Sequence, residues 1–129
     1  MRIFSIAFIF LLSAGSWAQA AGPKATPLLQ SDITGVPSHQ ALMTRVELPA
    51  NATLPMHYHP TEEFMYVIAG EAFLRIEGQE DKLISAGTSG KIPAGMIHTA
   101  VTRDKAAEVV VFRVHPKGQP VRTVPDQQK

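Results

Sequence analysis

The segment from Met56 to Gly70, MHYHPTEEFMYVIAG, constrains the fold more than any other part of this 129-residue chain. It places His57 and His59 two residues apart, and Glu63 follows four residues later. Side chains two residues apart on a β-strand lie on the same face, so the two imidazoles can point at one spot. Imidazoles and a carboxylate that converge on one spot bind ions such as zinc, iron, manganese, nickel or copper. The segment therefore predicts a metal site built on β-structure.

A second segment, Gly87 to Thr102, supplies a fourth candidate ligand. Its sequence, GTSGKIPAGMIHTAVT, places His98 after a proline and a glycine in a P-x-G-x-x-H pattern. The ligand types suit Fe, Mn, Zn, Ni or Cu, and they do not select one of these ions. We therefore predict one divalent transition metal ion, of open identity, bound by His57, His59, Glu63 and His98.

The two segments resemble the two sequence motifs of the cupin family. The first motif reads G-x5-H-x-H-x3-4-E-x6-G, and the chain fits it from the first histidine onward, with Asn51 in place of the opening glycine. The second motif reads G-x5-P-x-G-x2-H-x3-N, and the chain fits it with Thr102 in place of the final asparagine. The resemblance covers residues 40–115. It implies an all-β fold, the cupin-type double-stranded β-helix or jelly-roll barrel.

The hydrophobic pattern of the same region agrees with a barrel or a sandwich. Apolar and polar residues alternate in Leu42–Leu48, as they do in a half-buried strand. A hairpin turn is predicted at Ala69–Glu71, between two segments rich in β-formers. Short strands at a spacing of about ten residues are typical of all-β barrels and sandwiches. The other predicted strands are Glu63–Ile68, Ala72–Glu77, Lys82–Ser85 and Ala107–Val114.

The two ends of the chain differ from the middle. Arg2, the apolar run Ile3–Leu12 and the triplet Ala18-Gln19-Ala20 are typical of a secretory signal peptide, and the run is short for a membrane span. We predict that residues 1–20 are removed by cleavage after Ala20, or after Ala18, and that the protein is periplasmic or secreted. The alternative is an N-terminal membrane anchor. Residues 21–39 are predicted to be a loose N-terminal arm with a short edge strand around Leu28–Gln30, and residues 116–129 a C-terminal tail.

The charge balance bears on the partners of the protein. Loss of Arg2 with the signal peptide reduces twelve basic side chains to eleven, which equals the number of acidic ones. Nucleic acids and acidic membranes are bound by basic patches, so we expect neither as a partner. We expect a small-molecule ligand or substrate, and a homodimer that covers the aromatic side chains predicted to face outward. These are Tyr58, Phe64 and Tyr66.

Strand alternation also predicts the lining of a pocket. The predicted lining is small and mostly apolar: Met65, Val67, Met96, Ala100 and Thr102. No basic residue is committed to this pocket unless Arg45 or Arg75 turns inward, so the lining suits a small neutral or aromatic molecule rather than a phosphosugar. His39 and His115 lie outside the motifs and are expected not to be ligands. Glu62 would replace Glu63 only after a one-residue slip in register.

The predicted site suits a dioxygenase-like oxidoreductase acting on a small organic molecule. Three histidines and one glutamate leave open positions on the metal, and Glu63 is the candidate catalytic base. The cupin barrel hosts many chemistries, so the resemblance does not fix the reaction. Two alternatives stay open: a non-catalytic module that binds or senses a metal or small ligand, and a cupin lyase or isomerase.

Overall fold

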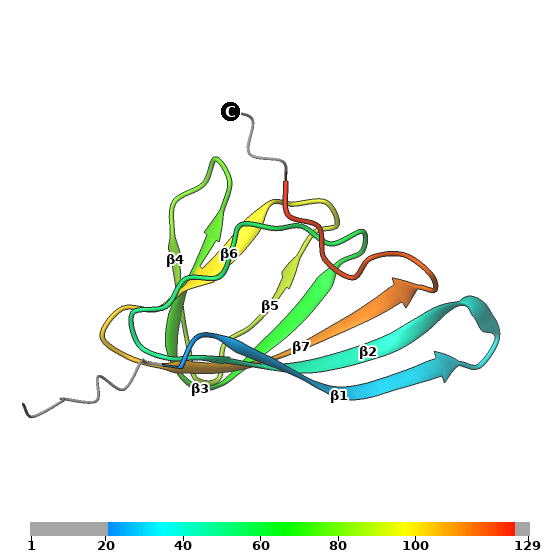
Figure 1. Cartoon of the computed structure of the whole chain (residues 1–129), viewed down its shortest axis with the longest axis horizontal. Helices are drawn as coiled ribbons and strands as arrows, with labels where there is room; N and C mark the ends of the chain where they lie inside the picture. The colour runs from blue at the N-terminus through cyan, green and yellow to red at the C-terminus, as the bar shows by residue number, and fades with distance from the viewer. Residues whose placement is uncertain (1–20, 126–129) are drawn as a thin grey trace, which may run out of the picture.

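The computed structural model describes residues 21–125, and every helix or strand in this range is a β-strand (Figure 1). The predicted signal peptide and residues 126–129 lie outside the described residues. None of the described residues belongs to a helix long and apolar enough to cross a membrane. The predicted all-β class is therefore confirmed. The strands are β1 (Lys24–Ile33), β2 (Val36–Leu48), β3 (Glu63–Ile76), β4 (Lys82–Ser85), β5 (Ser89–Ile92), β6 (His98–Val101) and β7 (Ala107–Pro116).

Strand β3 organises the fold because it belongs to two sheets. Its first part, Glu63–Val67, pairs with β7 and β5 in the sheet that continues through β2 to β1. Its last part, from Glu71 onward, pairs with β4 and β6. All of these pairings are antiparallel. Figure 1 shows the two walls diverging from β3, with β4 and β6 in one wall and β1, β2 and β7 in the other.

The prediction of a hairpin turn at Ala69–Glu71 is wrong, because β3 continues through these residues to Ile76. The register shifts between Val67 and Ala69, and Gly70 has a left-handed φ of 70°. A bulge followed by such a glycine bends a strand without reversing it. A bend and a hairpin both require a glycine at this place, so the sequence pattern alone did not separate them.

The N-terminal arm is also more ordered than predicted. Strand β1 pairs with β2 over ten residues, and β2 begins at Val36 rather than at Leu42. Eight of the ten residues of β1 are exposed, so neither face of the strand is buried. A strand exposed on both faces has no alternating hydrophobic pattern, which explains why its length was underestimated.

The hydrophobic core fills the space between the two walls. Leu74 is buried and Ile76 packs against the core, so these residues, rather than Phe73 and Arg75, line the inner wall. Arg75 instead forms an exposed ion pair with Asp81. The buried core residues are Leu48, Val67, Ala72, Leu74, Ile84, Ile92, Ala107, Val109 and Val111.

The two departures from the sequence motifs lie next to each other and are accommodated. Asn51 has a positive φ of 58°, a conformation that asparagine tolerates better than most residues. The Thr102 hydroxyl accepts a hydrogen bond from the Ala52 amide and donates one to the Pro49 carbonyl. Thr102 thus ties the end of β6 to the turn around Asn51.

We predict that Gly70→Ala strongly destabilises the protein. An added Cβ would lie 1.8 Å from the carbonyl oxygen of Ala106, and the positive φ would be strained as well. Gly78→Ala is the matched control, because Gly78 has a φ of 75° but no atom within 4 Å of its added Cβ. Gly78→Ala should cost about 1–2 kcal/mol of unfolding free energy and Gly70→Ala at least about 3 kcal/mol. Equal costs in urea unfolding would contradict the close contact.

Candidate metal centre

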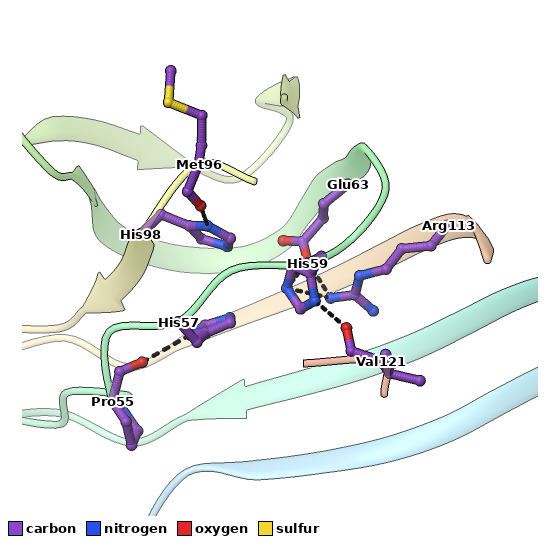
Figure 2. A network of polar contacts seen from close by, with 8 residues as sticks. All are labelled: Pro55, His57, His59, Glu63, Met96, His98, Arg113 and Val121. Atoms are coloured by element: carbon purple, nitrogen blue, oxygen red, sulfur yellow. Dashed lines mark hydrogen bonds and ion pairs between the residues drawn. The ribbon is translucent and has the colours of Figure 1, made fainter. Parts of the chain in front are cut away.

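Three of the four predicted ligands converge in the space between the walls (Figure 2). His57 lies in the segment between β2 and β3, and His98 is the first residue of β6. Their backbones form an antiparallel bridge with N···O distances of 3.0 and 2.8 Å. His59 follows, and its carbonyl accepts a hydrogen bond from the Gly95 amide. One ring nitrogen from each of the three buried histidines lies within 4.8 Å of the other two.

Each of these histidines donates one ring proton to a backbone carbonyl. The Nδ1 atoms of His57, His59 and His98 lie 2.7, 2.6 and 2.8 Å from the carbonyl oxygens of Pro55, Val121 and Met96. A carbonyl can only accept, so each Nδ1 carries a proton, and in the neutral form of each ring the lone pair lies on Nε2. Such contacts fix the tautomer and the ring orientation of metal-binding histidines.

The remaining nitrogens fit a metal ion. His98 Nε2 is buried and has no hydrogen-bond partner among the described residues. A buried polar atom without a partner is costly unless another ligand satisfies it. Three neutral imidazole nitrogens directed to one region form a donor set that suits zinc, iron, copper or nickel. The residues present therefore fit the divalent ion that the sequence predicted.

Glu63 lies at the edge of this group. One of its carboxylate oxygens is 3.1 Å from His59 Nε2, but no carboxylate oxygen belongs to the set of mutually close ligand atoms. The same oxygen accepts a hydrogen bond from the guanidinium of Arg113 (Figure 2). Glu63 therefore stands beside the histidines as a partner of His59 and Arg113. Glu62, its neighbour in sequence, is exposed and pairs with Lys91.

Arg113 is the functional residue that the sequence analysis missed. Its Nη2 atom lies 3.2 Å from His59 Nε2, and the side chain is almost fully buried. Arg45 and Arg75, the two arginines considered earlier, make surface ion pairs with Glu108 and Asp81 instead. The statement that no basic residue is committed to the pocket is therefore wrong. The signal was present, because Arg113 follows Val109 and Val111 in the inward-facing alternation of β7.

Burial keeps His57 and His98 neutral, whereas neighbouring charges keep Glu63 negative. Burial lowers the pKa of His57 to about 4 and also lowers the pKa of His98. Burial alone would raise the pKa of Glu63, but the nearby His59 ring and the charge of Arg113 outweigh it and lower that pKa to about 2. His57 and His98 are therefore neutral near pH 7, which is the form that binds a metal.

Two cavities adjoin the histidines. The inner one, of about 70 Å³, is lined by His57, Glu63, His98 and Arg113 together with apolar core residues. The outer one, of about 490 Å³, touches His57, His59 and Arg113 and extends along the inner face of β1 and β2. The inner cavity is too small for an organic molecule, so the outer one is the candidate substrate space.

The five predicted pocket residues are divided between the cavity and the core. Met65 and Ala100 line the inner cavity. Val67 is fully buried in the core, and the Met96 side chain packs against that core while its carbonyl orients His98. Thr102 is buried with its hydroxyl bound to backbone groups. Alternation predicted which face of each strand points inward but not how far along the strand the cavity extends.

The C-terminal tail contributes to the site. Tyr58 and Thr123 are joined by two backbone hydrogen bonds of 2.9 and 3.0 Å, which place the Val121 carbonyl against His59. His115 donates from Nε2 to the carbonyl of Gln119 and lies outside the three-histidine group, as does His39. The segment predicted to be a C-terminal tail thus orients one candidate ligand.

The low pKa of His57 predicts a pH-dependent stability for the metal-free protein. Between pH 6.5 and about 4 the unfolded chain binds a proton at this residue and the folded chain does not, so folding weakens as the pH falls. The free energy of unfolding should drop by about 1–3 kcal/mol across this window, and by less in His57→Gln. Urea unfolding in the presence of a chelator measures both slopes, with His39→Gln as the control. Equal slopes in the wild type and in His57→Gln would refute the prediction.

Known proteins share this architecture. A family model described as a cupin domain matches residues 44–115. A solved structure of an RmlC-like cupin family protein with a double-stranded β-helix fold, from Methanocaldococcus jannaschii, superimposes with a TM-score of 0.61. That superposition covers 90% of this chain and 96% of the other at 20% identity, and it supports the predicted double-stranded β-helix.

Curated relatives include two kinds of enzyme. Dimethylsulfoniopropionate lyase DddQ from Ruegeria pomeroyi is 33% identical over 82 residues, 63% of this chain and 41% of the relative. The crystal structure of DddQ superimposes with a TM-score of 0.61 at 26% identity, over 68% of this chain and 45% of that one. A 3-hydroxyanthranilate 3,4-dioxygenase from Mycosarcoma maydis is 34% identical over 74 residues, 54% of this chain and 41% of the relative. The chain thus spans about two fifths of the length of these relatives.

Proposed function

Because this chain belongs to the cupin family, we propose that it is a metal-dependent, dioxygenase-like oxidoreductase acting on a small organic molecule at a mononuclear site. The observation that carries the proposal is the group of three histidines whose Nδ1 protons are fixed by backbone carbonyls and whose Nε2 atoms face one region. This region borders a cavity of about 490 Å³, which is large enough for a small substrate.

The chain's own residues have separate roles in this proposal. His57, His59 and His98 would hold the metal, which when bound supplies Lewis acidity and, if it is redox-active, electron transfer. Glu63 is ionised and reaches His59, so it can complete the ligand set or accept a proton from a substrate group at the site. The buried apolar residues around the inner cavity exclude water from these polar groups.

A lyase is the second candidate function. The lyase DddQ is similar in both sequence and structure, while the 3-hydroxyanthranilate enzyme and a further relative, an acireductone dioxygenase, favour oxygen chemistry. A lyase reaction needs a base and a Lewis acid but no oxygen, so oxygen dependence separates the two. A protein that binds metal and converts none of the substrates tested would support the third reading, a non-catalytic binding module.

The experiment is elemental analysis of natively produced protein followed by assays with the metal found. Oxygen uptake should be measured with a panel of catechols and flavonols, and dimethylsulfoniopropionate consumption should be measured without oxygen. We expect substrate-dependent oxygen uptake. Substrate turnover that persists without oxygen would contradict the dioxygenase proposal and favour a lyase.

Replacement of His59 and His98 together with alanine should abolish stoichiometric metal binding. Loss of two of three converging imidazoles leaves too few ligands for a tight site. The control is His39→Ala, which removes a histidine outside the group. Metal content per protein, measured by mass spectrometry of dialysed samples, should fall from about one equivalent to near zero only in the double variant. A full equivalent in that variant would refute the assignment.

We also propose that the protein is exported to the periplasm or secreted. The support is the sequence of residues 1–20, with Arg2, its apolar run and its Ala-x-Ala triplet. N-terminal sequencing of exported protein should begin at Ala21 or at Gln19. A mature protein that begins at Met1 and stays in the cytoplasm would contradict export.

A homodimer is the proposed assembly. Among residues 21–125, β1 is an edge strand of the larger sheet, and such edges tend to pair or be covered. Leu28, Phe64, Tyr66 and Ile68 are exposed on this sheet. Sedimentation at micromolar concentration should give twice the monomer mass and Leu28→Glu should lower it, whereas a wild-type monomer would refute the dimer.

A further inference from the structure

The charged side chains that line the outer cavity, apart from its histidines, are all positive. Its walls carry three cationic side chains, Lys24, Arg113 and Arg122. Of the described residues that line it, none is an aspartate or a glutamate. A cavity with one sign of charge and low-dielectric walls attracts ligands of the opposite sign.

Arg113 is the cation closest to the histidines, and it has donors to spare. Its residue exposure is 7%, and its Nη2 atom contacts both Glu63 and His59. Its Nε atom is buried and has no hydrogen-bond partner among residues 21–125. A guanidinium carries five N–H donors in a planar fork that matches a carboxylate. Arg113 can therefore keep its contact with Glu63 and still bind an anion from the cavity.

Lys24 and Arg122 lie where the cavity meets solvent. Both are exposed, and no carboxylate of the described chain lies within ion-pair distance of either. They add positive potential at the entrance, although salt screens exposed charges. Arg113 can therefore contact an anion deep in the cavity, whereas the two exposed cations attract it toward the entrance.

Much of the remaining cavity wall is apolar. Leu29, Leu42 and Val46 line it from the β1–β2 sheet, and Leu54 and Val111 line it near the histidines. An apolar wall beside one buried cation fits a molecule with a charged end and an apolar body. A carboxylate accepts charge-assisted, bidentate hydrogen bonds from a guanidinium, and these are stronger than the bonds that a neutral acceptor makes.

We propose that the outer cavity takes a small organic carboxylate, whose acid group is held by Arg113 and whose apolar body packs against these side chains. The inference rests on the proposed function, because it assigns a substrate class to the same site. It replaces the neutral or aromatic ligand that the sequence had predicted. Arg113 is thus a specificity-determining residue.

The test compares carboxylates with their neutral amides. The probes are benzoate, phenylacetate and butyrate, each paired with its amide, and binding is measured by calorimetry in metal-free protein and again after zinc loading. Metal-free protein isolates the contribution of Arg113, because a metal would also attract carboxylates. At least one carboxylate should bind about tenfold or more tightly than its amide in both forms. If no pair shows this preference without metal, the proposal is overturned.

Variants locate the preference. Arg113→Gln should weaken binding of the preferred carboxylate about tenfold and leave its amide unchanged. Arg103→Gln is the matched control, because this exposed arginine lies over the Phe73 ring outside the cavity. Equal carboxylate binding in wild type and Arg113→Gln would overturn the assignment. If Arg113→Gln does not fold, the test uses Arg122→Gln instead. This variant should weaken carboxylate binding, more at low salt than at high salt. An unchanged carboxylate affinity would overturn the proposal.

The two proposals can fail separately. If the protein binds no metal but prefers carboxylates through Arg113, the cavity assignment stands and the proposed enzyme function fails. If the protein binds metal and shows no preference for carboxylates, the substrate class fails and the metal function stands.

Discussion

The fold depends on the passage of one strand through two sheets. β3 pairs with β7 and β5 before Gly70 and with β4 and β6 after it, so its bend fixes the angle between the walls. Glu63 is the first residue of β3, and the next residue, Phe64, pairs with Phe112 of β7. This register places Glu63 beside Arg113, the residue after Phe112. His98 starts β6, whose register against β3 sets the height of that histidine in the barrel. The position of the site is therefore a consequence of how one strand is bent.

Burial of so many polar groups in a small barrel would be costly without partners. In the structure, backbone carbonyls accept hydrogen bonds from the three Nδ1 atoms, and Arg113 donates one to Glu63. Two nitrogens beside the cavities, His98 Nε2 and Arg113 Nε, lack partners in the described chain. His98 belongs to the three-histidine group, and Arg113 lines both cavities beside it.

The sequence predicted the fold class and most of the inward-facing residues because both follow from local periodicity. His57 and His59 share a face as period two requires, and Met65 and Val67 point inward with Glu63. Gly70 was placed in a turn because a bend and a hairpin need the same residue. The length of β1 was underestimated because neither of its faces is buried. The pairing of Arg113 with Glu63 depends on a register between strands fifty residues apart, which no local pattern specifies.

The contact between Val121 and His59 ties the beginning of the site to the end of the chain. His57 and His98 can meet once β6 has formed, but His59 acquires its orienting carbonyl only when the segment after β7 has folded back to Tyr58. During synthesis, the third imidazole is therefore fixed only after Val121 has been added. A chain that stops short of Val121 would contain all three histidines without the complete arrangement that holds them.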